Sequence, residues 1–419
     1  MNLFDVFEVG TTGVKLEVLQ DERFSCHGCT DCCRHWHVQL IGDEAPRIAA
    51  LDWGDGDPLH GREVLLTKGP QTFLRHDADG ACVMLNRDTG RCRIHERFGE
   101  DAKPTGCRLF PFSLAPTFGN RVSVATRFTC PSVRRNAGVA HEEHFPELRK
   151  LAQRVVAGKG FDDEQMCQLR PEQVRAITEF AATLMAAFDR PAAKAVFLHA
   201  LCTWLAVQPA ESMNREALGE AFAELQEHVT ATLDAGAAKP GAVHRLAFGA
   251  VWASHLRRDE DVLDRRVGRV ARFLSLGRAC LGSGDLQRLG HDHPAGSIRK
   301  ARLFTGRGAE AAPEAFEVFW RMVRQKLASH QFMGAANFRR GMLEGLLDLC
   351  LLYPLVAASA RYHAAARDAE AVGADDVDYA TAAIERGFGR NAVLDSAPIG
   401  RLRMLLLRPG VYERLVLNL

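Results

Sequence analysis

The 419-residue chain has almost no net charge and no long hydrophobic run. Its 53 Lys and Arg balance 52 Asp and Glu, which leaves a formal net charge of +1, so no overall attraction to nucleic acid or anionic membranes is expected. No uninterrupted apolar stretch reaches the roughly 18 residues that span a bilayer, because Asp348 and Pro354 interrupt the most apolar segment, 346–356. The first residues also lack the basic and apolar regions of a signal peptide. We therefore expect a cytoplasmic protein that binds neither nucleic acid nor membrane.

Cysteine has the most uneven distribution of any residue type. Eight of the twelve cysteines lie in the first 130 residues: Cys26, Cys29, Cys32, Cys33, Cys82, Cys92, Cys107 and Cys130. Four thiolates complete one tetrahedral zinc site or one cubane cluster, so eight suffice for two centres or for one centre with spare ligands. A disulfide framework is the alternative, but a chain without a signal peptide is expected in a reducing compartment. The pattern therefore favours metal binding. The other four are interpreted as buried small hydrophobic residues: Cys167, Cys202, Cys280 and Cys350.

The spacing of the first cysteines favours iron–sulfur over zinc. Cys26-x-x-Cys29-x-x-Cys32 matches the start of the bacterial ferredoxin run, in which a remote Cys-Pro supplies a further ligand, and Cys130 precedes Pro131. A 4Fe-4S cluster is therefore expected, with zinc as the alternative, since both metals accept four sulfurs. In an extended segment adjacent side chains point to opposite sides. Cys33 is thus expected to serve a second centre, unless the backbone turns sharply after Cys32.

The later cysteines lie in segments rich in turn residues. Segment 82–95 predicts a short hairpin with 88–90 (Asp-Thr-Gly) as its turn and two cysteines near its arms. Pro104 and Pro111 are expected to fix a rigid loop around Cys107. Four nearby histidines are candidate ligands or donors to sulfur, although eight cysteines make them dispensable: His27, His35, His37 and His95. Three arginines that directly follow cysteines are expected to stabilise thiolates: Arg34, Arg93 and Arg108.

The two parts of the chain differ in their hydrophobic pattern. Residues 1–135 are rich in Gly, Pro, Asp and Cys, and the alternating stretches 13–19 and 121–126 predict strands. From about residue 140 the period is helical, and helices are predicted around 174–188 and over 192–207, 215–233, 243–257, 262–280, 314–329, 339–367 and 376–387. The sequence predicts a mainly α fold with two domains. The first is an irregular cysteine-rich metal-binding domain with a few short strands (1–135), and the second is an α-helical domain (136–419) that is expected to bind a substrate or a donor.

Four cysteine elements occur in a defined order. They are Cys-x-x-Cys-x-x-Cys-Cys at 26–33, Cys-x-x-Leu at 82–85, Gly-x-Cys-x-Ile-His at 90–95 and Pro-x-x-Cys-Arg-x-Phe-Pro at 104–111. Over about residues 24–130 the chain resembles the CxxCxxCC cysteine-cluster family, which includes bacterial flagellin lysine N-methylases. The stretch 319–332 is similar to that longer branch. The resemblance implies that the seven cysteines up to Cys107 are metal ligands, with Cys130 an eighth. It further implies an iron–sulfur cluster, S-adenosylmethionine as methyl donor, and a protein substrate such as flagellin.

Catalytic and donor-binding residues are not assigned by the sequence. Lysine methylation needs a neutral amine, which an acidic or tyrosyl pocket would favour, but Glu344, Asp348, Tyr353 and Tyr362 also fit an ordinary amphipathic helix. The stretch 51–56 (Leu-Asp-Trp-Gly-Asp-Gly) resembles a nucleotide-binding loop, yet its flanking residues predict an exposed turn. Two other functions stay open: a non-enzymatic metal module that docks a partner, and an electron-transfer or redox-sensing protein. Oligomeric state is not determined.

Overall fold

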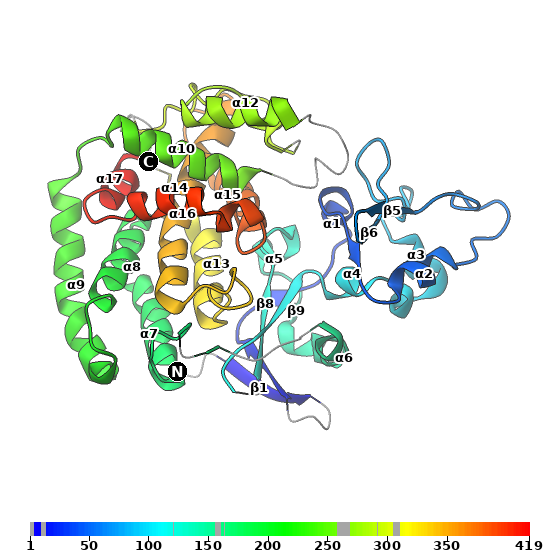
Figure 1. Ribbon diagram of the computed structural model, residues 1–419, viewed down its shortest axis with the longest axis horizontal. Helices are drawn as coiled ribbons and strands as arrows, with labels where there is room; N and C mark the ends of the chain where they lie inside the picture. Colours follow the sequence, from blue (N-terminus) through cyan, green and yellow to red (C-terminus); the bar gives the residue numbers. More distant parts are fainter. Residues whose placement is uncertain are drawn as a thin grey trace.

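The chain folds mainly into helices, with small sheets between them and the cysteine-rich segments (Figure 1). The computed structural model describes residues 4–9, 14–119, 121–155, 161–162, 164–257, 269–290, 292–304 and 311–419. The α-helices are α1 (Asp31–His35), α2 (Glu44–Ala49), α3 (Arg93–Phe98), α4 (Thr105–Leu109), α5 (Pro131–Arg135), α6 (Phe145–Val155), α7 (Pro171–Leu184), α8 (Pro191–Leu205), α9 (Arg215–Ala235), α10 (Ala242–Leu256), α12 (Arg269–Cys280), α13 (Glu317–Ala328), α14 (Met342–Ala366), α15 (Ala374–Gly387), α16 (Ala397–Leu406) and α17 (Tyr412–Asn418). The strands are β1 (Phe4–Val9), β2 (Val14–Leu19), β3 (Arg23–Phe24), β4 (Gln39–Leu40), β5 (Leu65–Lys68), β6 (Gln71–Leu74), β7 (Phe112–Pro116), β8 (Arg121–Thr126) and β9 (Val139–Ala140).

This architecture confirms the predicted fold class. The expected strands correspond to β2 and β8, apart from Gly13, which lies outside the described residues. The expected helices correspond to α7 through α10 and α12 through α15, although 262–268 also lie outside the described residues. Pro171 and Pro191 begin α7 and α8, because the first helical position needs no N–H donor. The domain boundary at residue 135 stays a prediction.

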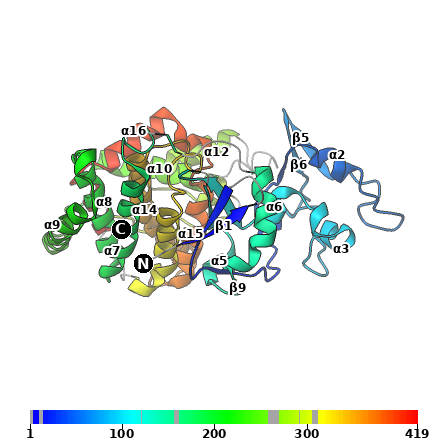
Figure 2. The same cartoon turned by 90° about the horizontal axis from the view of Figure 1, so that it is seen from below.

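The strand pairings join distant parts of the chain. The four-stranded sheet has the order β1-β2-β8-β7, in which β2 and β8 run parallel and the other neighbours antiparallel. A second pairing joins β3 to β9, with Arg23 opposite Ala140 and Phe24 opposite Val139. All eight clustered cysteines lie between β3 and β9. The cysteine-rich segment therefore enters and leaves the fold at one place, and Figure 2 shows β5, β6, α2 and α3 extending from that place away from the helices.

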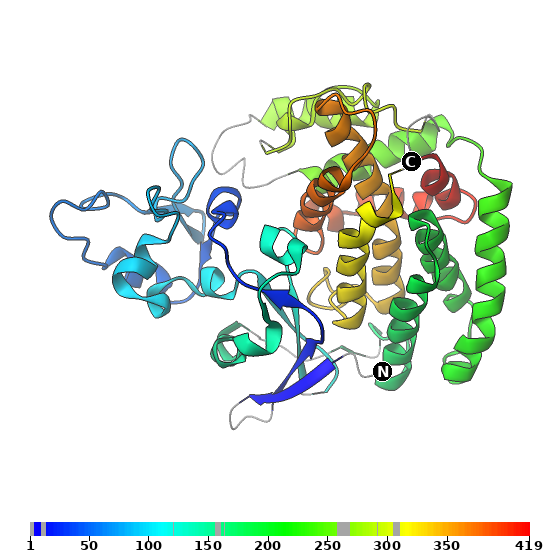
Figure 3. The same cartoon turned by 180° about the vertical axis from the view of Figure 1, so that it is seen from behind.

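Two hydrophobic cores result. The small core contains Val38, Leu40, Ile48, Trp53, Leu59, Val64, Leu74, Cys82, Val83, Met84 and Ile94. The main core extends from Leu16 of β2 to Val416 of α17 and includes Val124 of β8. Seen from behind, the helices form one body and the sheet lies beside it, toward the cysteine-rich segment (Figure 3). By packing, the four-stranded sheet belongs to the helical body.

Buried polar side chains attach the sheet to α13 and α15. The amide of Gln325 on α13 accepts from the Thr126 backbone N–H (2.9 Å) and donates to the Thr126 hydroxyl (2.8 Å). Directly after β8, Arg127 forms an ion pair with Glu385 of α15 at 2.9 Å. Lys326 contacts the same carboxylate at 3.2 Å. Because a buried polar group without a partner is costly, these contacts fix the sheet to the helices.

Helix α14 is long and mostly buried. Among the described residues it is the one helix with the length and apolar composition of a membrane span. Most of it is buried by neighbouring helices. Tyr412 of α17 donates a 2.7 Å hydrogen bond to the Cys350 carbonyl, and Trp252 of α10 donates one of 2.8 Å to Ser359. A core helix of a folded protein has the same composition.

Replacing Glu385 tests the buried ion pair. Burial alone raises the pKa of Glu385, but Arg127 and Lys326 outweigh that effect and leave the pKa below its ordinary value. Glu385→Gln leaves two buried cations without a counter-charge, so we expect a loss of about 3 kcal/mol in unfolding free energy. In the wild type this stabilisation is present above the unfolded-state pKa, about 4.3, and is lost as pH falls through the lowered folded-state value.

The measurement is urea unfolding of both proteins at neutral and acidic pH, with Glu224→Gln on the exposed face of α9 as the matched control. Equal unfolding free energies for the two variants at neutral pH would contradict this account.

Candidate metal centre

The first four cysteines lie on a loop and a single helical turn. Thr30, with a left-handed φ of 65°, ends the loop, and α1 then carries two adjacent cysteines. The N–H of Cys33 donates to the Thr30 carbonyl at 2.9 Å. The extended backbone considered for this segment is therefore wrong. On a helix, adjacent side chains are separated by about 100° around the axis rather than lying on opposite sides, and the neighbouring Cys33 thiol, followed by burial, raises the pKa of Cys32 well above its ordinary value.

The predicted turn after Cys82 is confirmed in part. Leu85 and Cys92 form an isolated antiparallel bridge, and the Asn86 N–H donates to the Arg91 carbonyl at 2.8 Å, which closes the turn at 88–90. The arm after Cys92 is not a strand, however, because helix α3 begins there. The N–H of Cys82 donates to the Cys33 carbonyl at 2.7 Å. This bond ties the turn to α1.

Cys107 lies on α4, one helical turn rather than the expected loop. Glu44, itself buried, accepts from the Thr105 N–H at 2.6 Å and so fixes the start of that turn. A methyl group on Gly106 would come within 3.1 Å of the Trp36 ring, so the backbone approaches Trp36 closely. The thiol is thereby held against the small core.

Four thiols form what we call the inner group: Cys33, Cys82, Cys92 and Cys107. Cys82 belongs to the small core and the other three pack against it. Burial raises the pKa of Cys82 to about 12, with a smaller contribution from the negative charge of Cys92. Burial likewise raises the pKa of Cys107, followed by repulsion from Cys82 and Cys92. The Cys82, Cys92 and Cys107 sulfurs are thus close enough to influence one another's ionisation.

The remaining four form the outer group: Cys26, Cys29, Cys32 and Cys130. Cys130 begins α5 and lies in the main core, and burial raises its pKa to about 11, with smaller contributions from Cys29 and Cys32. Cys26 and Cys29 are exposed. Burial is the largest cause of the raised pKa of Cys29, and the negative charges of Cys32 and Cys26 raise it further. Cys32 also interacts with Cys82 and Cys107, so it lies where the two groups meet.

This thiol set suits a thiophilic metal. All twelve cysteines are free rather than paired in disulfides. Among the described residues, no three His, Cys, Asp or Glu side chains stand close enough to hold an ion as they are oriented, so ligation requires the thiols to rotate toward one another. The raised pKa values show that protein groups alone do not favour thiolates here. A bound cation reverses that preference, because coordination deprotonates thiols.

The flanking basic residues differ from expectation. Arg108 forms ion pairs with Asp101 (2.8 Å) and Glu147, not with a thiol. Arg34 donates to the Thr30 hydroxyl at 3.3 Å. Lys103, which the sequence analysis did not single out, lowers the pKa of Cys92 and Cys107 by its charge against the larger effect of burial. Its position immediately before the Pro-x-x-Cys-Arg element was the available signal.

The candidate histidines have other contacts. His27 hydrogen-bonds Ser132 through Nδ1 and Arg135 through Nε2 (3.2 Å). His37 stacks on His76 with ring centroids 3.9 Å apart. His95 lies 3.0 Å from Glu100, and the side chain of His35 lies outside the described residues. These contacts orient the rings toward oxygen, nitrogen or ring partners.

The four scattered cysteines also differ from one another. Cys202 and Cys350 are buried as expected, and their sulfurs lie 3.8 Å apart between α8 and α14. Cys167 is exposed and Cys280 is partly exposed. The interpretation of these last two as buried hydrophobic residues is therefore wrong.

Residues 25–131 match the family CxxCxxCC, described as "Putative zinc- or iron-chelating domain". No curated protein matches the chain, and no solved structure does. The matched range contains all eight clustered cysteines. The match is therefore limited to the segment that carries these cysteines, and the resemblance to flagellin methylases has no matching relative.

A substitution at Gly138 tests how the outer group is positioned. Its φ is +117°, and an added Cβ would lie 2.5 Å from the Ser25 backbone nitrogen, next to Cys26. Gly138→Ala should therefore separate β3 from β9 and lower the unfolding free energy by at least about 2 kcal/mol. Faster amide exchange at residues 23–25 and 139–140 would locate the damage. The control is Gly61→Ala, which has a positive φ of +64° but no atom within 4 Å of its Cβ. Equal losses in both variants would contradict the steric argument.

Proposed function

We propose that this chain is an iron–sulfur protein with two four-sulfur centres, one held by the inner group and one by the outer group. The observation that carries the proposal is the division of eight thiols into a set packed on the small core and a set containing the Cys-x-x-Cys-x-x-Cys run and Cys130. Four sulfurs per set match the requirement of a cubane cluster. The adjacent Cys32 and Cys33 then serve different centres. Zinc is the alternative metal.

The surroundings of the two groups suit different roles. The inner group lies against a hydrophobic core, where a metal would bind together the loops of the cysteine-rich segment. The outer group includes two exposed thiols, so its centre would be accessible to a partner or substrate. A cytoplasmic location fits both, because cluster assembly needs reduced thiols.

Serine variants separate the two centres. Cys82→Ser should remove the inner metal and Cys130→Ser the outer one, each lowering bound iron by roughly half if both sites hold equal clusters. Iron, zinc and sulfide analysis of anaerobically purified protein, together with absorbance at about 400 nm, measures this. The control is the exposed Cys167→Ser, which should change nothing. Colourless protein with zinc alone would contradict the clusters, and unchanged metal in both variants would contradict the ligand assignment.

We further propose that the protein methylates lysines of a protein substrate such as flagellin, with S-adenosylmethionine as methyl donor. Besides the sequence resemblance, one feature favours a protein substrate. A groove of about 1290 Å³ adjoins α5 and is bordered by α13 and α15, larger than the roughly 300–1,000 Å³ of small-molecule sites. Its lining includes Asp189, Glu317 and Asp375, whose charge suits a lysine ammonium, alongside basic residues such as Arg324.

Three of the four residues considered for catalysis are engaged elsewhere, and the fourth, Glu344, is exposed. Asp348 binds Arg403 and accepts from Asn337 at 3.0 Å. Tyr353 stacks on Trp320, and the Tyr362 hydroxyl donates to the Pro294 carbonyl at 2.9 Å. The 51–56 stretch is a turn in which Asp52 accepts from the Gly54 N–H at 2.9 Å, as expected. Binding of the methyl donor is therefore not assigned to any of these residues.

Methyl transfer can be measured directly. Cluster-replete protein incubated with labelled S-adenosylmethionine and flagellin should label lysines, and Asp375→Asn in the groove should lower kcat/KM about fivefold through loss of one ion pair. Asp234→Asn on α9 is the matched surface control. No transfer at all would overturn the methylase proposal. If that inactive protein is reduced and reoxidised reversibly in a titration, electron transfer would then be favoured. If it is not, a structural metal module would be favoured.

A further inference from the structure

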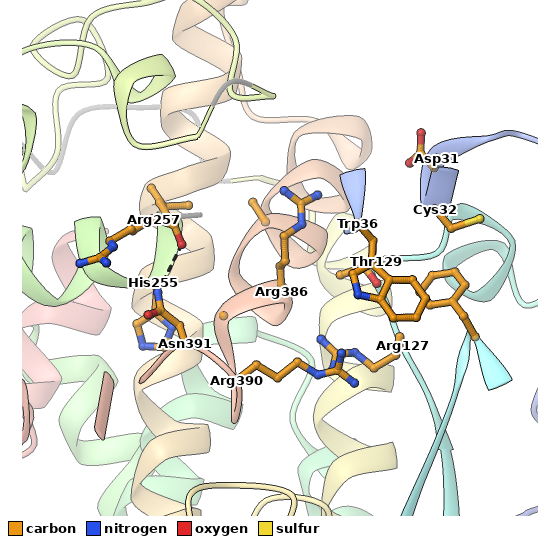
Figure 4. Close-up of a pocket in the computed structure, with 14 residues that line it drawn as sticks. Asp31, Cys32, Trp36, Arg127, Thr129, His255, Arg257, Arg386, Arg390 and Asn391 are labelled. Carbon is orange, nitrogen blue, oxygen red and sulfur yellow. Dashed lines mark hydrogen bonds between the residues drawn. The ribbon is translucent and has the colours of Figure 1, made fainter. Parts of the chain in front are cut away.

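A cavity separates the cysteine-rich segment from the helical body. It measures about 150 Å³, and its lining includes Asp31 and Cys32 of α1, Trp36, and residues at the end of α15. Figure 4 shows Asp31 and Cys32 on one side of it and His255, Arg257 and Asn391 on the other. At roughly 30 Å³ per water molecule, it has room for a small group, not for a large cofactor.

The lining is strongly basic. Four arginines border the cavity: Arg127, Arg257, Arg386 and Arg390. Asp31 is the single carboxylate among the described lining residues, although Arg386 also forms an ion pair with Asp292 outside the lining. Behind them Glu385 interacts with Arg127, Lys326 and Arg390, so one carboxylate serves three cations. Arginine presents planar pairs of N–H donors that match the oxygens of carboxylate and phosphate. The side chains of Arg127 and Arg390 extend toward the same region below Trp36 (Figure 4).

A second, independent feature is His255 on α10. The residue borders both this cavity and a smaller neighbouring one, it is only 6% exposed, and its Nδ1 atom has no hydrogen-bond partner among the described residues. Burial, with help from Arg403 and Arg340, lowers the pKa of His255 to about 3, so the ring is neutral near pH 7. Gly387 lets α15 approach closely, since a Cβ there would lie 2.8 Å from the His255 carbonyl oxygen. A buried ring nitrogen without a partner indicates a missing polar ligand.

We propose that this cavity binds a small oxyanion, the carboxylate or phosphate group of a substrate or effector, beside Cys32. The arginines supply charge and paired donors, while His255 and Asn391 border the opposite wall. The site goes beyond the proposed function and does not depend on it, because arginines rather than thiols hold the ion. If the outer metal centre is present, the anion places its parent molecule next to that centre.

The test is a calorimetric titration of the full-length protein with inorganic phosphate and, in a second arm, with succinate. We expect saturable binding of at least one of them. Arg390→Gln and Arg257→Gln should each weaken it about tenfold or more, since a charged hydrogen bond contributes about 1.5–3 kcal/mol. Quenching or enhancement of tryptophan fluorescence that disappears in Trp36→Phe would place the ion in this cavity. The control is Arg299→Gln, an exposed arginine of the helical body.

Binding that responds to Arg390→Gln but not to Arg299→Gln, at unchanged thermal stability, supports the site, and the arm that binds tells carboxylate from phosphate. No saturable binding of either ion by wild-type protein overturns it, as does equal weakening in all arginine variants. Metal analysis of the same samples keeps the two proposals apart. If protein purified without metal binds the anion, the result supports the oxyanion site and counts against the proposed metal centres. If the protein contains metal but binds no anion, the result supports the metal centres and counts against the oxyanion site.

Discussion

The pairing of β3 with β9 is the constraint on which the candidate site depends. It holds the two ends of a segment of more than a hundred residues at one place, so that Cys29 near the start and Cys130 near the end come into one region. The parallel pairing of β2 with β8 repeats this closure next to it. Closing so long a loop costs conformational entropy. The main core offsets that cost, because β2 and β8 are buried in it.

The cysteine-rich segment itself has little apolar material. Its own core contains eleven buried residues, one of them Cys82, and from α1 to α4 its elements are strands of two to four residues and α-helices of five or six. Small domains of this kind usually need disulfides or metals as additional support. The thiols packed against the small core are in the right place to give it. Stability and metal binding are therefore expected to be coupled in this half of the molecule.

The helical body contributes more than a support. Arg127 and Cys130 both follow β8 within a few residues, so the strand that enters the main core also brings one cation and one thiol to the boundary with the cysteine-rich segment. Glu385 and Arg390 come to the same boundary from α15, more than 250 residues later. The thiol-rich region and the basic cavity thus share one interface, where a charged molecule could meet a metal centre.

Much of this was readable in the sequence. Cysteine spacing identified the chelating segment, because ligand geometry limits the gaps between thiols, and the periodicity of apolar residues predicted α7 through α10 and α13 through α15, because each helix buries one face. Local pattern failed where contacts come from afar. The burial of Cys82 and Cys130 in different cores, the ion pairs of Arg108 and the basic cavity all depend on residues distant in the chain. Such pairings are set by the packing of the whole fold, and no local stretch of sequence encodes them.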